Sequence, residues 1–568
     1  MKTRRNVCSA SALSLLLASI AVAQTAPLTP QRVAVPTLLT HIEDAYADFN
    51  DANGAVSLID SGLPVVQSGG EVVGDTSVGS YAGKDREAWQ RIYAAKRSEL
   101  LRELAKVSAR DLSAQDARAV ELMRAVVAES QASPDSLAPI GRCKDAQRHA
   151  LQLQKLQEAL YACFAEHANN LQFEKSAVTR VAAFDLLTRM EEPERRKSLF
   201  MAFVPLWQSL NTDGSGTSPY RRMIRMAAAE GRKKGSPIDA AARTIGVPSA
   251  QIERWLEQVL DTWREVSGSS MVEPWDYRFQ GGAAERELGE SIPREAFQSL
   301  NQRYYADLGI NLAQSGVLYD LDPRSGKAPL AYTDYVRRGR TVNSQWQPTV
   351  VRVSASYDRG GLGSLNELVH ESGHAVHMLA LHTRPAFMDL GDPIFFEAFA
   401  DVPSWSVYEP AWQQKYLGRS AAESVSLRAL YSAVMLDVAW ALFDLRMLQD
   451  PQRDPNVVWT EITSRYLHIV PHPELAWWAV RVQLVDTPGY MVNYGLGAVI
   501  TADIRQRIRE QLGAFDSGDA RWYGWLSQRL LASGEEQPTV QLLQQFLGRP
   551  VSPRALLNEI GRIKGASH

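Results

Sequence analysis

The sequence is poor in cysteine, has almost no net charge, and has no long uncharged apolar run beyond its first residues. Three cysteines in 568 residues exclude a scaffold built on disulfides. A formal net charge of −3 argues against a nucleic-acid partner, because nucleic-acid-binding domains are usually strongly basic. Neither an internal repeat nor a low-complexity tract is present, which excludes a repeat architecture. What remains is a globular composition, 45% hydrophobic and 22% charged, that predicts a sizeable core.

The first 23 residues are typical of a secretory signal. A basic start from Lys2 to Arg5 precedes an apolar stretch from Ala12 to Ala18 and a small-residue cleavage site that ends at Ala23. We therefore predict that residues 1–23 are removed and that the mature chain starts at Gln24, in a periplasm or outside the cell. The apolar stretch is too short to span a bilayer, and we expect no membrane span in the mature chain.

Two cysteines remain after removal of the signal, Cys143 and Cys163. An oxidising compartment would allow them to form a disulfide. The segment between them, residues 144–162, has the apolar spacing of one helix. A continuous helix would hold the two cysteines about 30 Å apart, beyond the reach of a disulfide. Pairing therefore requires a break in that helix, and the sequence leaves both outcomes open.

Hydrophobic periodicity predicts a mainly α-helical chain. Residues 61–84 are rich in Gly, Ser and Val and predict a long loop or a hairpin. Residues 85–280 place apolar side chains on one helical face almost throughout. Short β-like runs occur at residues 317–319 and 350–353, after which helical periodicity resumes. The predicted fold is mainly α, with one small sheet near the motif described next.

Length alone allows one large domain or several smaller ones. We expect residues 24–568 to form a single helical domain. Residues 24–270 are predicted to be mostly an N-terminal helical lobe, and residues 271–568 to be the catalytic region, because the chemical motifs lie there.

The clearest chemical signal is an HExxH motif at residues 370–374. Ser364 and Glu367 form a capping box, which predicts that a helix begins at Ser364. His370 and His374 then lie one turn apart on one face, about 6 Å along the axis, so both imidazoles can bind one metal ion. Glu371 points to the adjacent face, within reach of a water on the metal. We predict one zinc ion bound by His370 and His374, with Glu371 as the catalytic base.

A third protein ligand is needed to leave one coordination position open for water. Asp392 followed by a proline is a typical helix start, and this helix would carry Glu397 and Asp401 one turn apart. We predict that Glu397 binds the metal and that Asp401 orients a ligand histidine through its second ring nitrogen. The alternative makes Asp401 the third ligand. His377 faces the metal side of the first helix, and we expect it to form a local hydrogen bond rather than to close the site.

At this point the sequence resembles the thimet oligopeptidase and oligoendopeptidase family of zinc peptidases. Residues 370–377 match the family signature HExGHxxH. Three weaker matches follow in the family's order. Pro274-Trp275-Asp276 resembles its PWD element, Leu318 to Lys327 its YxDLxPRxGK element with Leu318 in place of tyrosine, and Phe546 to Leu557 its usual ending. The resemblance covers roughly residues 270–565.

The resemblance implies a mainly helical, two-lobed shell around a deep cleft, with unstructured oligopeptides as substrates. In that family the third ligand lies in Phe-x-Glu-x-Pro-Ser, which here begins at Phe399 and puts Asp401 at the ligand position. The Glu-Ala-x-x-Asp arrangement that starts at Glu397 instead resembles the angiotensin-converting-enzyme-like peptidases, in which the glutamate binds metal. The spacing from His374 is also close to theirs, so we favour Glu397.

A second segment of the resemblance supplies two tyrosines, Tyr490 and Tyr494, which match residues that stabilise the transition state in the family. Their spacing lets both face the site if the segment is helical, and ordinary aromatic packing is the alternative reading. The family has a histidine ahead of this segment, but none stands near Val485. The nearest histidines are His468 and His472.

These patterns predict an exported zinc-dependent peptidase that hydrolyses oligopeptides with Glu371 as general base. One alternative is a carboxypeptidase or dipeptidyl carboxypeptidase, which needs a cation for the terminal carboxylate of the substrate. Arg481 is a candidate for that cation. A second alternative is a peptide-binding protein with weak or no turnover, for which the missing histidine is the sole support. An intact Glu371 argues against it, because a binder needs no base.

Overall fold

The structure is a computed structural model. It describes residues 37–62, 64–66, 72–75, 79–108, 112–130, 143–147, 151–212, 215–324, 327, 331–390 and 392–565. The predicted signal peptide and its cleavage site lie outside these residues. The described chain is mainly helical, with small sheets of two or three strands, which confirms the predicted fold class.

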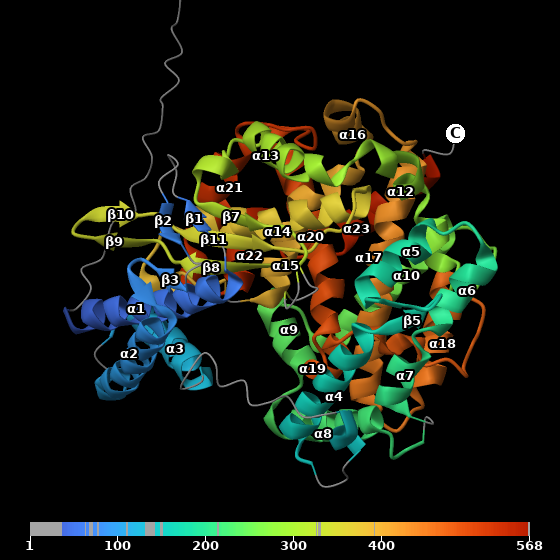
Figure 1. Cartoon of the computed structure of the whole chain (residues 1–568), viewed down its shortest axis with the longest axis horizontal. Coiled ribbons are helices and arrows are strands. Elements are labelled where there is room, and N and C mark those ends of the chain that lie inside the picture. The colour runs from blue at the N-terminus through green and yellow to red at the C-terminus, as the bar shows by residue number, and fades with distance from the viewer. Residues whose placement is uncertain are drawn as a thin grey trace, which may run out of the picture.

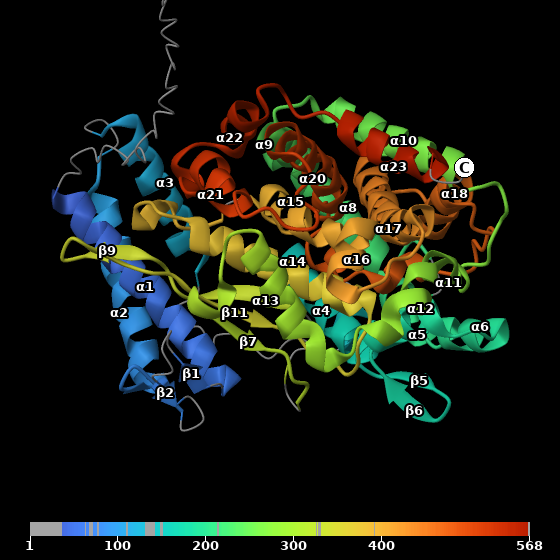
Figure 2. The ribbon, with the colours of Figure 1, turned by 90° about the horizontal axis from the view of Figure 1, so that it is seen from above.

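An N-terminal group of helices stands to one side of the molecule, at the left of Figures 1 and 2. It consists of α1 (Thr37–Ser61), α2 (Arg86–Lys106) and α3 (Ala114–Glu129). These helices bury their own apolar cluster, which includes Tyr46, Phe49 and Met123. Between α1 and α2 lie short antiparallel hairpins, in the region predicted as a loop or hairpin: β1 (Pro64–Val66), β2 (Val72–Asp75), β3 (Ser80–Tyr81) and β4 (Lys84–Asp85).

The described residues of the next part of the chain are mainly helical, as predicted, with one hairpin of β5 (Leu171–Phe173) and β6 (Ser176–Val178). Its helices are α4 (Leu153–Ala168), α5 (Arg180–Arg189), α6 (Pro193–Met201), α7 (Val204–Asn211), α8 (Pro219–Lys234), α9 (Pro237–Ile245), α10 (Ser249–Val266), α11 (Tyr277–Gly281), α12 (Ala283–Leu288) and α13 (Phe297–Asp307).

The continuous helix predicted between the two cysteines is wrong. Helix α4 begins at Leu153, and Cys143 belongs to a separate 3₁₀ turn, Cys143–Gln147. The turn folds back beside α4 because both bury apolar side chains, Ala146 and Leu160, in the same core. The break brings Cys143 and Cys163 together in a disulfide, with their Cα atoms 4.1 Å apart.

A three-stranded sheet precedes the motif helix. Its order is β7 (Val317–Asp320), β11 (Val350–Ser354) and β8 (Tyr332–Arg337), with β11 parallel to β7 and antiparallel to β8. The two predicted strands are confirmed as β7 and β11. Strand β8 and the hairpin of β9 (Arg340–Val342) and β10 (Gln345–Gln347) were not predicted, because their sequences are polar and carry no clear alternation. Helix α1 lies so close to β8 that a Cβ atom on Gly54 would come 2.3 Å from the carbonyl oxygen of Val336.

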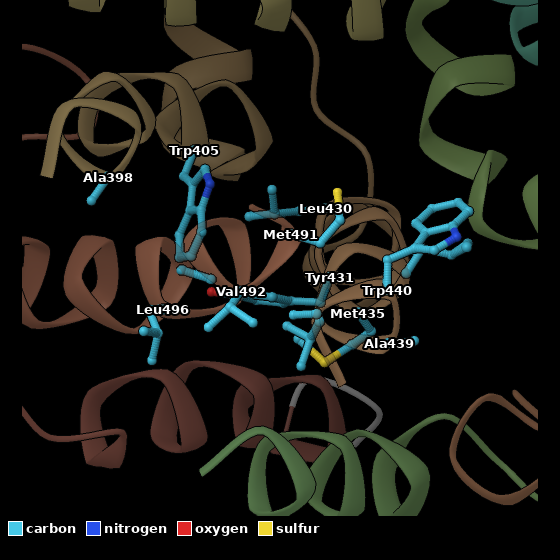
Figure 3. Close-up of a cluster of buried hydrophobic side chains, with 14 of the residues drawn as sticks. Ala398, Trp405, Leu430, Tyr431, Met435, Ala439, Trp440, Met491, Val492 and Leu496 are labelled. Carbon is cyan, nitrogen blue, oxygen red and sulfur yellow. The ribbon is translucent and has the colours of Figure 1, made fainter. Parts of the chain in front are cut away.

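The remaining helices are α14 (Leu362–Ala380), α15 (Pro393–Ser404), α16 (Pro410–Leu417), α17 (Glu423–Gln449), α18 (Pro455–Leu467), α19 (Gln483–Asp486), α20 (Met491–Leu512), α21 (Trp522–Leu526), α22 (Thr539–Leu547) and α23 (Arg554–Gly565). Figure 3 shows the core among them, where Trp405, Tyr431, Met435 and Val492 pack together from neighbouring helices. Helix α17 has the length and apolar composition of a membrane span, but 67% of that stretch is buried inside the protein, as in a core helix.

The main apolar core is continuous from Ala146 to Ile563 and crosses the predicted boundary near residue 270. Only α1 to α3, together with Ala386 and Phe387, form a second large cluster among the described residues. The predicted division of the single domain into two parts stays a prediction.

Candidate metal centre and its cleft

Helix α14 carries the HExxH motif and begins earlier than predicted. Its first residue is Leu362, so the capping box predicted at Ser364 is wrong and Ser364 lies inside the helix. The first turn is capped from elsewhere, because the carboxylate of Glu285 on α12 accepts a hydrogen bond from Gly363 N at 2.8 Å. Gly361 precedes the helix with φ at +138°, a backbone conformation that would be strained for a residue with a side chain. A carboxylate from a distant segment therefore fixes where the helix starts.

The two motif histidines lie on one face of α14, with ring centroids 4.7 Å apart. His374 is buried and stacks on Phe396 of α15 at 3.7 Å, whereas the side chain of His370 is 20% exposed. Nδ1 of His374 has no hydrogen-bond partner among the described residues, so aromatic packing holds this ring. The pair is thus rigid on one side and open toward solvent on the other.

Glu397 on α15 faces both histidines. Its Oε2 atom lies 3.5 Å from Nε2 of His370 and 3.9 Å from Nε2 of His374. For tetrahedral coordination at about 2.0–2.1 Å from a zinc ion, two donor atoms lie about 3.4 Å apart. The distances from Glu397 Oε2 to the two nitrogens are close to this value, and His370, Glu371 and His374 also offer ligand atoms within 4.8 Å of one another. Helix α15 is capped as predicted, since Asp392 accepts hydrogen bonds from Ile394 N and Phe395 N at its start.

Asp401 lies one turn further along α15 and contacts the opposite side of the His370 ring. Its Oδ1 atom is 2.8 Å from His370 Nδ1 and accepts a hydrogen bond from Ser404 Oγ at 3.2 Å. This is the contact that the predicted orienting role requires, and it leaves Nε2 of His370 free to face Glu397. Burial alone would lower the pKa of His370, but Asp401 and Glu397 raise it well above its ordinary value. The carboxylates thus give this site a negative electrostatic potential, which favours the binding of a cation.

Glu371 is buried beside the histidines and is held by the sheet. Thr333 Oγ1 on β8 lies 2.8 Å from Oε2 of Glu371 and 2.9 Å from its backbone carbonyl oxygen. Burial, more than the neighbouring carboxylates, raises the pKa of Glu371 to about 7. A carboxylate with a raised pKa next to a cation site can take up and release a proton near neutral pH.

His377 does not form the predicted local hydrogen bond through Nδ1, which has no partner among the described residues. Its ring instead packs against Phe395 and Phe399, with centroids 5.3 and 5.2 Å away. Burial lowers the pKa of His377 to about 3. The reason is that this face of α14 meets an aromatic face of α15, which offers no polar partner.

The tyrosine segment lies at the start of α20. Tyr490 is the residue before the helix and Tyr494 is in its first turn, with ring centroids 5.8 Å apart. Burial and then the charge of Glu397 raise the pKa of both hydroxyls, to about 12 for Tyr490, so both lie within electrostatic reach of the third carboxylate. Asp444 on α17 holds this segment by accepting hydrogen bonds from Gly489 N at 2.8 Å and from Met491 N at 3.2 Å.

Neither of the two histidines nearest in sequence replaces the one missing from the tyrosine segment. His468 ends α18 and contacts Arg264 O at 3.2 Å, and His472 contacts Glu273 at 2.9 Å, so neither ring takes part in the site. Tyr494 instead accepts a hydrogen bond from an amide, because Gln483 Nε2 donates to Tyr494 Oη at 3.4 Å. An amide has no pattern that a sequence search would single out, so sequence reasoning missed it. Thr333 and Asp444 were missed for the same reason.

Two of the weaker sequence motifs, residues 318–327 and 546–557, form structural contacts, and their described residues supply no side chain to the metal centre. Asp320 accepts hydrogen bonds from Arg324 at 2.6 Å and from Lys327 at 3.0 Å, which closes the loop after β7. In the C-terminal motif, Arg549 donates two hydrogen bonds to the buried Asp503 on α20. Both contacts are buried or half-buried charge pairs that fix chain direction near the catalytic helices.

A cleft leads away from the histidines. Its cavity of about 460 Å³ is lined by His370 and Glu367 of α14, by Phe184 of α5 and by Arg278 of α11. Helices from before and after the sheet thus form its two walls. A cavity of this size accommodates a short extended peptide.

Comparison with known proteins agrees with this geometry. The sequence profile of peptidase family M3 matches residues 248–562. No curated protein sequence matches the chain. Among solved structures, the crystal structure of the M32 carboxypeptidase from Deinococcus radiodurans R1 is similar, with a TM-score of 0.52 and 14% sequence identity. The similarity covers 93% of this chain and 100% of that chain and is one of fold.

Proposed function

The chain belongs to peptidase family M3, and from this premise we propose that it hydrolyses oligopeptides with one zinc ion held by His370, His374 and Glu397. The family match confirms the resemblance that starts from the HExxH segment, and the chain is a metallopeptidase. The observation that carries the proposal is the convergence of Glu397 Oε2 on the Nε2 atoms of both histidines. Zinc is proposed because two imidazoles and one carboxylate, with a fourth position open, are typical of catalytic zinc sites.

When bound, the zinc ion supplies Lewis acidity that polarises the scissile carbonyl and lowers the pKa of a water molecule. The remaining work falls to the chain's own residues. Glu371 accepts the proton of the attacking water at Oε1 or Oε2 and then donates it to the departing amine. Thr333 holds the Glu371 carboxylate in place by the hydrogen bond to Oε2.

Tyr490 and Tyr494 are proposed as donors to the oxyanion that develops on the scissile carbonyl. Both hydroxyls are protonated at neutral pH, as a donor requires, and burial raises their pKa further above the ordinary value. Gln483 restrains Tyr494, and Asp444 restrains the backbone on either side of Tyr490. A placed donor at such a position is typically worth about 3–4 kcal/mol in the transition state.

The direct test compares the wild type with Glu371→Gln on a mixed pool of synthetic oligopeptides. We expect the variant to lose roughly 10²–10⁴-fold in rate, the usual contribution of a general base. Zinc content should be unchanged, because the base is not a proposed ligand. A wild type no faster than Glu371→Gln would leave a peptide-binding protein and overturn the proposal.

A second candidate is cleavage restricted to the carboxy end of the peptide. Arg278 in the cleft lining favours it, and so does the similarity in fold to an M32 carboxypeptidase. Both candidates use the same catalytic centre. They differ in whether the scissile bond may lie anywhere in the peptide or must lie close to its C-terminus.

We also propose that the enzyme acts after export. The disulfide between Cys143 and Cys163 supports this proposal, because such bonds persist in oxidising compartments. N-terminal sequencing of the protein purified from its native host should give Gln24 as the first residue. A mature protein that retains Met1 would contradict export by a cleaved signal.

A further inference from the structure

Three arginines lie close enough to repel one another beside the cleft: Arg180 at the start of α5, Arg278 in α11 and Arg481 just before α19. The Phe184 ring lies between two of them, 5.3 Å from Arg180 Cζ and 3.9 Å from Arg278 Cζ. Arg481 Cζ lies 4.6 Å from the Trp440 ring. Arg278, Phe184 and Trp440 line one small cavity, so the aromatic rings that contact the three arginines are neighbours.

Two of these cations have no acidic partner in hydrogen-bonding contact. Arg481 pairs with Asp437 on α17. Arg180 and Arg278 form no side-chain hydrogen bond and no ion pair with any residue that the structure describes. Elsewhere in the described chain, buried arginines are paired with carboxylates: Arg196 with Asp276, Arg352 with Asp334 and Arg505 with Asp516. Arg180 and Arg278 are half-buried and line or adjoin the cleft, so their guanidinium groups are available to an anionic ligand.

The grouping is unfavourable without an anion. Burial, and then repulsion from Arg180, lowers the pKa of Arg278 to about 10 and that of Arg481 to about 9. Guanidinium groups nevertheless stay charged at neutral pH. Asp437 already pairs with Arg481, and Glu367 attracts Arg180 at longer range. Asp185 and Glu285 also line the cleft, but both pair with Arg189. The cluster thus keeps excess positive charge in a partly dehydrated place, as an anion-binding site does.

The cluster lies on the path of a substrate. The cavity that contains Arg278 and Phe184 is continuous with the wall formed by Glu367 and His370. A peptide whose scissile bond is at His370 and whose chain follows this cavity reaches Arg278, and Arg180 lies on the Phe184 ring beside it. The anionic group at the end of every unmodified peptide is the α-carboxylate, which guanidinium binds in a bidentate manner.

We propose that Arg180, Arg278 and Arg481 bind the C-terminal α-carboxylate of the substrate, so that the enzyme removes residues from the carboxy end of oligopeptides. This inference rests on the proposed peptidase function and specifies its substrate class. Arg481 alone was the candidate from the sequence. Because it already pairs with Asp437, the charge available to a ligand comes mainly from Arg180 and Arg278, which no sequence pattern marks.

The test uses an equimolar pool of octapeptides, prepared once with a free C-terminal carboxylate and once with a C-terminal amide. We expect the wild-type, zinc-loaded enzyme to cleave the free acids about 100-fold faster in kcat/KM than the amides. Mass spectrometry should place the cuts close to the carboxy end. In Arg278→Gln and Arg180→Gln the acid rate should fall by roughly that factor, while the amide rate stays within about twofold of the wild type.

A matched control is Arg359→Gln. This arginine is 58% exposed and contacts Asp185 on the cleft rim at 3.8 Å, so the variant removes one positive charge near the cleft without touching the cluster. It should keep the wild-type acid-to-amide ratio. Because the ratio is measured within each protein, a partly misfolded variant lowers both rates and does not imitate loss of the anchor.

The outcomes separate this inference from the proposed function. Equal cleavage of acids and amides, with Glu371-dependent activity intact, would overturn the carboxylate anchor and leave the peptidase proposal standing. Equal acceleration of both pools by sodium chloride would assign the cluster to an inorganic anion and also overturn it. If neither pool is cleaved, calorimetric titration of Glu371→Gln with both pools decides: tighter binding of the acids supports the anchor, and equal binding overturns it.

Discussion

Asp401 Oδ1 lies 2.8 Å from Nδ1 of His370, while Glu397 Oε2 lies 3.5 Å from Nε2 of the same ring. Two carboxylates one turn apart on α15 therefore contact one imidazole through different nitrogens. Only the Glu397 oxygen also approaches His374, at 3.9 Å. This relationship favours Glu397 as the third ligand and Asp401 as the group that orients His370.

The orienting role of Asp401 predicts a graded effect on metal affinity. Removing the carboxylate in Asp401→Ala should weaken zinc affinity by about 10- to 100-fold, the usual cost of losing a partner behind a ligand histidine. Asp401→Asn keeps an acceptor for the Nδ1 hydrogen and should lose less. Competition with a chromogenic chelator measures both affinities, and equal affinity in wild type and Asp401→Ala would refute the role.

Thr333 is predicted to affect turnover without affecting the metal. Thr333→Val removes the hydroxyl that lies 2.8 Å from Glu371 Oε2 and keeps the side-chain shape. A hydrogen bond to a charged group contributes about 1.5–3 kcal/mol, so kcat should fall by roughly 10- to 100-fold with zinc content unchanged. Thr333→Ser retains the hydroxyl and should stay close to the wild type. Similar losses in both variants would point to packing instead.

Tyr490→Phe and Tyr494→Phe are expected to lower kcat while KM changes little, because an oxyanion donor acts in the transition state. The loss should approach about 10²–10³-fold for the hydroxyl that makes the main contact. Tyr408→Phe serves as the control, since Tyr408 also lines the cleft but lies on the stretch after α15. If both variants retain wild-type kcat, the tyrosines are ordinary packing residues.

Asp444 predicts a pH dependence of stability that is opposite to that of a salt-bridged carboxylate. Burial raises its pKa to about 7 in the folded protein, despite hydrogen bonds from Gly489 N and Met491 N. The folded state therefore holds this proton more tightly than the unfolded state, whose pKa is about 3.9. Its contribution to stability is fully present below about pH 4 and is lost as the pH rises through about 7.

The variant Asp444→Asn isolates this contribution, because the amide oxygen can still accept both backbone hydrogen bonds. Relative to this variant, the wild type should lose a few kcal/mol of unfolding free energy at most as the pH rises from 4 to 7.5. Urea unfolding at matched pH values, monitored by tryptophan fluorescence, measures the difference. A wild type that gains stability over Asp444→Asn in this range would show that the carboxylate is ionised and satisfied in the fold.

The parts of the site that depend on spacing along one helix could be predicted from the sequence. His370, Glu371 and His374 share one turn and a half of α14, and Glu397 and Asp401 share one turn of α15, so helical periodicity fixes their faces. The start of α14 could not be predicted, because Glu285 caps it from a segment about 80 residues away. Capping rules that consider only neighbouring residues predicted Ser364 and Glu367 as the capping pair instead.

Residues on other helices and strands that support the chemistry could not be predicted from the sequence either. Thr333 lies on a polar strand without clear alternation, and Gln483 and Asp444 are common residue types in helical segments. Arg180 and Arg278 are about 100 residues apart in sequence and meet only through Phe184. The helix break at Leu153 escaped prediction because the residues before it continue a helical apolar pattern, although tertiary packing folds the chain back.

The central claim is that one metal ion is held by His370, His374 and Glu397, and zinc per chain tests it most directly. The measurement is mass-spectrometric metal content after reloading with excess zinc and desalting, for the wild type, Glu397→Ala and Asp401→Ala. The account predicts close to one zinc per chain in the wild type, a near-complete loss in Glu397→Ala and substantial retention in Asp401→Ala. Loss in Asp401→Ala with retention in Glu397→Ala, or a wild type that binds no metal after reloading, would contradict it.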